Sequence, residues 1–386
     1  MITGNVLGPV VSGIAAAAVA ASASPAVAAG GGGLRPVVER LTGPDGAPGA
    51  LARVDGRDGR QVAAAGVADV RTGAPMNPRS RFRIGSATKT FTAAVVLQLA
   101  GEGRIHLDAP VERYLPGVVR GADNDGRRIT VRQLLQHTSG LPDVLDHLSP
   151  LEVLKDPLRH WDAQELVDIA LPHPREFTPG EGWGYSNTNY LLAGMIIGRV
   201  TGHPYGDEVR RRVIVPLGLH DTFVPRDAPG IPGPHPRGYV RPGSDLVDIT
   251  RLNPSVAGAA GGMISSAADL DRFLAALLRG RLLKPAQLRE MLHTRPTGRA
   301  SGSAYGLGLQ WLPATDRPGC PHGFWGHDGD MLGFSVRTAA TMDGRQATVM
   351  VNLNPGGGPA LDEAMDDALP TALCGPARPP APEAGG

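Results

Sequence analysis

A serine and a lysine three residues apart could form a nucleophile and its own base. Ser86-Ala-Thr-Lys89 opens a segment that predicts a helix, and positions three apart on a helix share a face. Serine is a weak nucleophile until a base removes its proton, and lysine acts as a base only when neutral. Burial would lower the pKa of Lys89 by disfavouring its charged form. An arginine could not replace it, which gives a physical reason for a lysine in a chain with three lysines and 35 arginines.

That spacing alone is weak evidence, because it arises by chance in about one chain in eight of this composition. The alternative is a helix-capping serine with a lysine nearby. A second element, Tyr185-Ser186-Asn187, stands in a predicted loop before a helix. The Tyr185 hydroxyl could relay a proton between nucleophile, lysine and leaving group, and Asn187 could hold a substrate amide or steady Lys89. Alone, the same residues would more often be a loop tyrosine and a helix cap.

A third element, His327-Asp328-Gly329-Asp330, lies on or beside a late predicted strand. Gly329 would let a substrate backbone approach closely, although such a sequence is more often a plain turn. Together and in this order, the three elements resemble the serine penicillin-binding protein and β-lactamase superfamily. The segments FRIGSATKTFTA, VRQLLQHTSGLP, YSNTNYLLAGMII and YGLGLQW look like its class C branch. The likeness is strongest to secreted D-alanyl-D-alanine carboxypeptidases and covers about residues 35–375.

The resemblance implies a role for each of these residues. Ser86 would become the acyl-enzyme, while Lys89 and Tyr185 would share general base and acid duty in an order the sequence leaves open. Asn187 would contact substrate, and His327 would take the cationic place of the third motif. The backbone N–H groups of Ser86 and Asp330 would form the oxyanion hole. Neither a cofactor nor a metal site is expected.

The third motif departs from the family pattern. Asp328 and Asp330 stand where the family has a hydroxyl or small residue, and Gln310 stands where the carboxypeptidases carry an arginine for the substrate carboxylate. Two like charges about 4 Å apart repel by about 4 kcal/mol at an effective dielectric near 20. We therefore expect a neutral or cationic group on the substrate beside Asp328, Gly329 and Asp330. The alternative is that Arg337 or another arginine pairs with the acids and ordinary activity survives.

Hydrophobic patterning indicates the elements that must position these residues. The segments 50–56 and 60–68 predict a hairpin, 82–84 a strand, and 90–100 a helix that is apolar on nearly every face. Capping patterns predict a helix from Thr130 to His137, a capping box at Asp162 and Glu165, and a helix from Ser266 to Leu278. Further predicted elements are a helix at 188–200, an irregular loop at 225–243, strands at 304–312, 322–328, 331–338 and 346–353, and a helix at 360–373.

Strands at both chain ends with helices between them predict an α/β (α+β) fold. The resemblance implies that this is the β-lactamase/transpeptidase-like fold, an antiparallel sheet flanked by helices with a mostly helical insertion. We expect a single catalytic domain over 34–375, with its sheet part at about 34–105 and 260–375 and its helical part at about 106–259.

The two ends of the chain and its composition indicate where the protein is located and what it binds. The first 33 residues carry no charge and are rich in alanine, which favours a signal peptide cleaved near Ala28 and a secreted protein. The tail 376–386 is expected to be disordered, and no later segment predicts a membrane anchor. In an exported chain Cys320 and Cys374 would form a disulfide; otherwise they would be buried free thiols. A net charge of +1 gives no reason to expect nucleic acid, and we expect a monomer with a small-molecule or peptide substrate.

These features predict a secreted serine hydrolase acting on D-amino-acid peptides, amides or related esters. A β-lactamase or an esterase of the same fold is the enzymatic alternative, since both form the same acyl-enzyme. An inactive penicillin-binding sensor domain is the alternative without catalysis, and the intact Ser86, Lys89 and Tyr185 argue against it.

Overall fold

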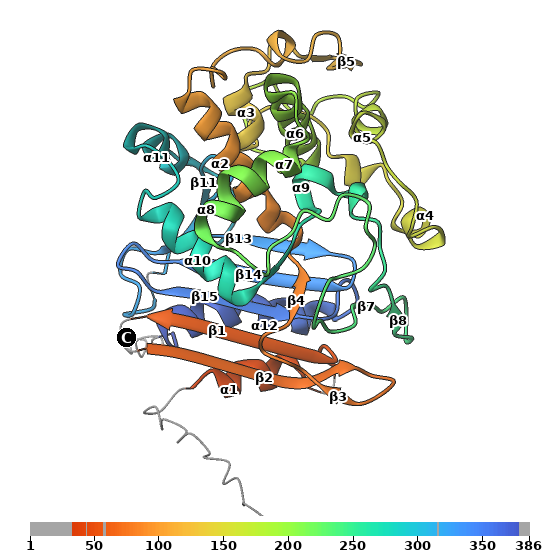
Figure 1. Cartoon of the computed structure of the whole chain (residues 1–386), viewed down its shortest axis with the longest axis vertical. Coiled ribbons are helices and arrows are strands. Elements are labelled where there is room, and N and C mark those ends of the chain that lie inside the picture. Colours follow the sequence, from red (N-terminus) through yellow and green to blue (C-terminus); the bar gives the residue numbers. More distant parts are fainter. Residues whose placement is uncertain (1–32, 44, 57–58, 315, 378–386) are drawn as a thin grey trace, which may run out of the picture. The chain divides into compact units, whose positions relative to one another are not determined.

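A computed structural model describes residues 33–377 except residues 44, 57–58 and 315. The predicted leader up to residue 32 and residues 378–386 of the predicted tail lie outside the described residues. Within the described part, nine strands form one antiparallel sheet in the order β10-β11-β12-β13-β14-β15-β1-β2-β3 (Figure 1). Their bounds are β1 Gly49–Gly56, β2 Gly59–Asp69, β3 Ala74–Pro75, β10 Arg295–Pro296, β11 Ala304–Tyr305, β12 Gln310–Leu312, β13 Phe324–Met331, β14 Phe334–Ala340 and β15 Gln346–Val351.

The two ends of the chain meet in this sheet, as predicted. β1 pairs antiparallel with β15, so that Ala50 lies opposite Val351. The predicted hairpin is formed by β1 and β2. Three two-stranded pairs lie outside the large sheet: β4 Arg81–Arg83 with β9 Ile264–Ser266, β5 Arg120–Gly121 with β6 Asn124–Asp125, and β7 Tyr239–Val240 with β8 Val247–Asp248.

The predicted strands at 304–312, 322–328 and 331–338 differ from the observed ones, and β14 begins at Phe334 rather than at 331. β13 continues to Met331 rather than ending at 328, so the whole third motif lies within a strand. The predicted strand 304–312 is two short strands, because the chain turns at Gly308 to approach the helix that follows Ser86. The Thr90 hydroxyl donates a 2.7 Å hydrogen bond to the Gly308 carbonyl at this turn.

Helices cover both faces of the sheet. Ala52 and Val349 face α1 and α12, whereas Leu51 and Met350 face the larger core that includes α2 and α10. The helices are α1 Leu34–Leu41, α2 Thr88–Gly101, α3 Val131–Gln136, α4 Pro150–Lys155, α5 Ala163–Ala170, α6 Asn187–Thr201, α7 Tyr205–Val209, α8 Val215–Leu217, α9 Gly258–Gly261, α10 Ala267–Leu278, α11 Pro285–Leu292 and α12 Gly358–Cys374. Single 3₁₀ turns are η1 Gly85–Ala87, η2 Val111–Arg113, η3 Val144–Asp146 and η5 Pro254–Val256, and η4 Arg210–Ile214 is a π-helical turn.

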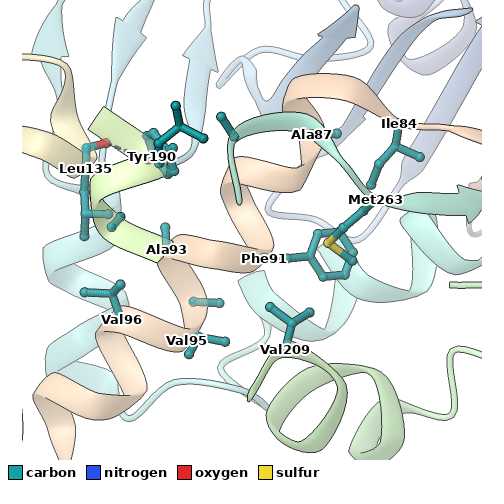
Figure 2. Close-up of a cluster of buried hydrophobic side chains, with 14 of the residues drawn as sticks. Ile84, Ala87, Phe91, Ala93, Val95, Val96, Leu135, Tyr190, Val209 and Met263 are labelled. Carbon is teal, nitrogen blue, oxygen red and sulfur yellow. Dashed lines mark hydrogen bonds between the residues drawn. The ribbon is translucent and has the colours of Figure 1, made fainter. Parts of the chain in front are cut away.

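α2 is the buried helix on which the site is built. Its apolar side chains pack on all sides, as predicted from their distribution around the helix. Phe91 stacks on Phe273 with ring centroids 3.7 Å apart, and Figure 2 shows Phe91 beside Met263 and Val209. Such packing leaves the helix little freedom to tilt, so the residues at its start keep their positions.

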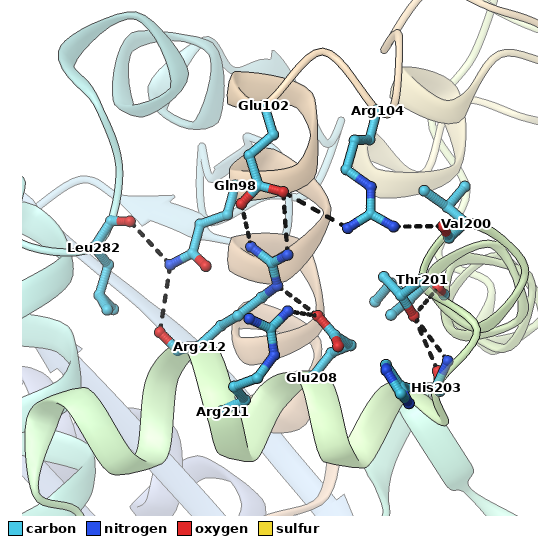
Figure 3. Close-up of polar contacts among 11 residues, drawn as sticks. Gln98, Glu102, Arg104, Val200, Thr201, His203, Glu208, Arg211, Arg212 and Leu282 are labelled. Carbon is cyan, nitrogen blue, oxygen red and sulfur yellow. Dashed lines mark hydrogen bonds and ion pairs between the residues drawn. The ribbon is translucent and has the colours of Figure 1, made fainter.

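An ion-pair network holds the other end of α2 (Figure 3). Arg212 of η4 pairs with Glu102, just past the helix, and with the buried Glu208. Gln98 donates a 3.0 Å hydrogen bond to the Leu282 carbonyl. Removing one partner of a buried ion pair lowers the free energy of unfolding by more than the intact pair contributes, because the other charge is left buried and unpaired.

Two of the three capping predictions are confirmed. Thr130 and Gln133 form a capping box at α3, and Ser266 caps α10 by accepting from the Asp269 N–H. The predicted capping box of α5 is wrong, because the Asp162 side chain makes no cap bond. Asp162 contacts His160 instead, and Arg159 forms an ion pair with Glu165. Here side-chain pairing with a neighbouring basic group outcompetes the local cap.

The cysteine prediction is confirmed, since Cys320 and Cys374 are joined by a disulfide that ties the loop before β13 to the end of α12. Among the described residues, no helix combines the length and the apolarity needed to cross a bilayer.

Candidate active site

Ser86 sits on the single turn η1, which follows β4 and leads directly into α2, so the helix begins near Ser86 as predicted. This turn packs directly against β13. A Cβ on Gly85 would lie 2.6 Å from the Asp330 carbonyl oxygen, and one on Gly329 would lie 2.0 Å from the Ile84 carbonyl oxygen. Gly329 therefore makes room for the turn that carries Ser86. The predicted approach of a substrate backbone to Gly329 stays a prediction. Ser86 and Asp330, whose N–H groups are the predicted oxyanion pair, line one pocket.

The Lys89 amine is fully buried and has three neighbours within hydrogen-bond distance. Its Nζ lies 3.0 Å from Ser86 Oγ, 2.7 Å from Asn187 Oδ1 and 2.8 Å from the Ala260 carbonyl oxygen. Burial lowers the pKa of Lys89 to about 7, against an opposing effect of the Asp143 charge. A neutral amine has two N–H groups and one lone pair. The amide and carbonyl oxygens can only accept, so both N–H groups go to them and the lone pair is left facing Ser86.

Asp143, at the start of η3, fixes the orientation of Asn187. The Asn187 Nδ2 donates to both carboxylate oxygens, at 2.9 and 3.2 Å, and its backbone N–H donates at 3.0 Å. The amide nitrogen is thereby turned to Asp143 and the amide oxygen to Lys89. Burial raises the pKa of Asp143, and the backbone N–H groups of Leu145 and Asn187 oppose that rise.

Tyr185 stands over the amine, with Lys89 Nζ 4.8 Å from its ring centroid. Burial raises the pKa of Tyr185, and a hydrogen bond with Ser86 opposes the rise. The imidazole of His137 lies against the same ring, 4.3 Å between centroids. His137 Nδ1 accepts from the Ser186 N–H at 3.1 Å, whereas its buried Nε2 has no hydrogen-bond partner among the described residues. His137 is thus a fully buried support for the position of Tyr185.

His327 reaches the pocket as predicted, but it is not a cation. Burial is the main cause that lowers the pKa of His327 to about 3, and the positive charge of Lys89 is the second cause. Its Nδ1 lies 2.6 Å from the Asp328 carbonyl oxygen, so Nδ1 carries the proton. The Nε2 atom then accepts from the Tyr305 hydroxyl at 2.7 Å. The predicted cationic role is wrong because a fully enclosed imidazole loses more solvation than any partner here returns.

The two acids of the third motif share a face and an arginine. Arg337 of β14 lies 3.6 Å from Asp328, 3.2 Å from Asp330 and 3.5 Å from Asp366 of α12. Burial alone would lower the pKa of Arg337, but the three carboxylates raise it above its usual value. Burial raises the pKa of Asp328, and Arg337 opposes the rise. The alternative stated above, pairing with Arg337, is what the structure shows.

These side chains line a pocket of about 340 Å³. Of the predicted residues, Ser86, Tyr185, Asn187, Gln310, His327, Asp328 and Asp330 line it, and Lys89 lies just beneath. Prediction missed Asp143, Trp183, Arg299 and Tyr305, which also line it. Asp143 follows the HTSGLP segment and Tyr305 opens YGLGLQW, so both stood within or beside segments already noted for likeness. No His, Cys, Asp and Glu cluster suited to a metal ion occurs among the described residues.

Comparisons with known proteins agree with this geometry. The Beta-lactamase family model matches residues 34–371. A D-stereospecific amidohydrolase from Streptomyces sp. is 39% identical, with a TM-score of 0.81, over 89% of this chain and 98% of that one. The D-amino acid amidase of Ochrobactrum anthropi SV3, complexed with L-phenylalanine amide, is 30% identical, with a TM-score of 0.72, over 87% of this chain and 96% of that one.

Curated relatives match over shorter segments. The esterase EstB of Burkholderia gladioli is 36% identical over 189 residues, which cover 46% of this chain and 47% of the esterase. Penicillin-binding protein 4* of Bacillus subtilis is 32% identical over 167 residues, 41% of this chain and 34% of the relative. The chain thus spans less than half the length of these two relatives. The family model and the solved structures nevertheless cover nearly all of the described residues, and the chain belongs to the beta-lactamase family.

Proposed function

We propose that this protein is a secreted serine hydrolase that cleaves amides and esters of D-amino acids bearing a free α-ammonium group. The D-selectivity is suggested by the similarity to the Streptomyces amidohydrolase and the Ochrobactrum amidase. Export is suggested by the alanine-rich leader. We do not propose a preference for carboxypeptidase substrates, because these place a carboxylate beside the nucleophile.

The charge of the pocket carries this proposal. Three carboxylates line it, those of Asp143, Asp328 and Asp330. Arg299 also lines the pocket, and Arg337 is shared by Asp328, Asp330 and Asp366, so the carboxylates still outnumber the arginines. Lys89, whose pKa is about 7, and His327, whose pKa is about 3, add little further positive charge. An ammonium group on the substrate is attracted to such a site, and a carboxylate at the same place is repelled.

The hydrogen bonds around Lys89 support the chemistry of acyl transfer. Its lone pair accepts the Ser86 proton as Oγ attacks the substrate carbonyl. The backbone N–H groups of Ser86 and Asp330 would stabilise the oxyanion. Tyr185 and Lys89 together return the proton to the leaving amine or alcohol, the C–N or C–O bond breaks, and the acyl group stays on Ser86. Water then attacks this ester, the proton passes back through the same groups, and the D-amino acid leaves.

The test compares D-phenylalanine amide with its L-enantiomer and with N-acetyl-D-phenylalanine amide. We expect kcat/KM to be highest for the free D-amide and at least about tenfold lower for the acetylated one, which lacks the ammonium. Higher kcat/KM for the acetylated substrate would contradict the proposal. Mass spectrometry should find the acyl group on the wild type and none on Ser86→Ala. Sustained nitrocefin turnover, as opposed to a single burst, would favour a β-lactamase instead.

A further inference from the structure

A second cavity, of about 360 Å³, lies between α6, α7 and α9 (Figure 1). We call it the α9 cavity. It shares no lining residue with the Ser86 pocket among the described residues. Its walls are mainly apolar and include the side chains of Trp161, Leu191, Met195, Tyr205 and Val224. The volume falls within the range of small-molecule sites, which is about 300–1,000 Å³.

Gly198 leaves space in the α9 cavity that the packing of the fold does not require. It stands inside α6, where glycine stabilises the helix less than alanine does. A Cβ on Gly194, also in α6, would lie 2.5 Å from the Ala259 Cβ, so that glycine permits close packing. A Cβ on Gly198 would meet no atom closer than 3.7 Å, and an alanine would fit there. What the missing side chain of Gly198 provides is the open space of the cavity.

The charged groups that line the α9 cavity already have partners of opposite charge. His160 Nδ1 lies 2.5 Å from Asp227 Oδ1. Arg226 donates to both carboxylate oxygens of Asp207, at 2.6 and 2.7 Å. An ion would enter this mainly apolar space without a free counter-charge, which is costly. The cavity therefore favours a neutral molecule, unlike the Ser86 pocket with its excess of carboxylates.

Tyr205 offers the hydrogen bond that can orient such a molecule. Its hydroxyl has no hydrogen-bond partner among the residues that the structure describes. Burial raises the pKa of Tyr205, so the hydroxyl stays protonated and can donate to a carbonyl oxygen. The rings of Trp161 and Tyr205 and the thioether of Met195 favour an aromatic body on the ligand, because ring–ring and sulfur–ring contacts are stabilising.

The short helix α9 connects this cavity to the reacting groups. Gly258 and Ala259 line the cavity. The next residue, Ala260, accepts from the Lys89 amine at 2.8 Å, and the Ala259 carbonyl accepts from the Thr92 hydroxyl of α2 at 2.9 Å. A helix of four residues has little stability of its own, so its position depends on what packs against it. The contents of the cavity therefore affect how firmly α9 is held against Lys89.

We propose that the α9 cavity binds a small neutral aromatic molecule with a carbonyl acceptor, and that this binding raises kcat at Ser86. The carbonyl oxygen of the molecule accepts from the Tyr205 hydroxyl, and its ring packs against α9. A ligand shifts a protein toward the conformation that it binds better. Here that conformation is the one in which the Ala260 carbonyl holds the Lys89 amine. The α9 cavity is thus an effector site, which goes beyond the proposed function.

Calorimetric titration with acetophenone and with ethylbenzene tests the hydrogen bond of the site. The two probes have the same ring and a side chain of the same length, and only acetophenone has an acceptor. We expect Tyr205→Phe to weaken acetophenone binding about fivefold and to leave ethylbenzene binding unchanged. The proposal would be overturned if acetophenone did not bind to the wild type, or if Tyr205→Phe weakened both probes equally.

Gly198→Leu tests the location, because a leucine side chain occupies the open space. It should weaken acetophenone binding at least about tenfold. The thermal unfolding temperature should not fall, since leucine is the better helix former. Arg199→Leu is the matched control: Arg199 is the next residue of α6, is exposed and does not line the cavity, so acetophenone affinity should not change. Unchanged affinity in Gly198→Leu would place the probe elsewhere and overturn the proposal.

Turnover of D-phenylalanine amide at saturating acetophenone tests the coupling. We expect kcat to rise at least about twofold with KM unchanged, and no further rise in Gly198→Leu. A kcat that stayed the same or fell would overturn the coupling of the cavity to Lys89. If the amide were not turned over at all, the proposed function would fail, and the titrations would still decide whether the α9 cavity binds its ligand.

Discussion

The side-chain oxygen of Asn187 lies 2.7 Å from the amine of Lys89, and Asp143 holds it in that orientation. An asparagine amide is free to present either its oxygen or its nitrogen, and only the oxygen can accept from a neutral amine. The carboxylate of Asp143 therefore acts through Asn187 on the direction of the Lys89 lone pair. Asp143 is a positioning residue, and its removal has two separable effects.

Asp143→Asn should lower kcat/KM by about tenfold, since it replaces the oxygen that accepts the 2.9 Å bond from Asn187 Nδ2 and so holds the Asn187 amide less firmly beneath Lys89. It should also move the ascending limb of the pH profile to lower pH, because the Asp143 charge raises the pKa of Lys89. Asp146→Asn, an exposed neighbour in η3, is the control and should change neither quantity. A limb that stays in place or moves to higher pH would contradict the positioning role.

The pH dependence of the wild type follows from Lys89. Its folded pKa of about 7 means that the fraction of neutral amine, and with it kcat/KM, rises as the pH passes through about 7. Substrates with a free α-amine should lose binding as that amine deprotonates near pH 8, which gives a bell-shaped profile. A matched ester without an amine should keep the ascending limb and lose the descending one. If the two substrates gave the same descending limb, the ammonium would not be what the pocket recognises.

Substitutions of His137 should distinguish its effect on the position of Tyr185 from its effect on the stability of the fold. His137→Asn keeps an acceptor for the Ser186 N–H and tolerates the left-handed backbone, φ 59°, but removes the ring beside Tyr185. We expect kcat to fall while KM and thermal stability change little. His137→Phe keeps a ring and leaves the Ser186 N–H unpaired, which should destabilise the fold by about 1–3 kcal/mol. Full kcat in His137→Asn would show that the imidazole serves the fold alone.

Arg337→Met should destabilise the protein by about 2 kcal/mol, less than for a wholly buried pair because Asp330 and Asp366 are half or more exposed. Urea unfolding measures the change. The penalty should shrink as the pH falls, since protonation of Asp328, whose pKa is raised by burial, removes one of the repelling charges. Asp328→Asn in the same chain should restore much of the lost stability. No restoration would mean that Arg337 stabilises by packing and not by charge.

The motif residues were predictable from sequence because their chemistry demands particular residue types at fixed local spacing. Ser86 and Lys89 are one helical turn apart, so one segment determines their geometry. The protonation state of His327 was not predictable, because it depends on enclosure by Tyr305 and Tyr185 from distant segments. The same holds for Gly329, whose missing side chain is explained only by the packing of Ile84 against it.

Arg299 and Asp143 show the same limit at the pocket wall. Nothing in the local sequence distinguishes Arg299 from Arg295, and only the folded chain shows which of them lines the pocket. The sheet, by contrast, could be predicted from alternating apolar residues at both chain ends. Successive side chains of a strand point to opposite faces, so this alternation shows which of them face the core. Local patterns thus predicted the scaffold and the reacting groups, and long-range packing set their charges.

The close contact of Gly85 with the backbone of Asp330 also sets when during synthesis the protein can become active. The turn that carries the nucleophile is synthesised well before β13, the strand that packs against it. Contacts between such distant segments form late, because a long loop must close first. A nascent chain therefore carries an inert Ser86 until β13 and its neighbours have joined the sheet.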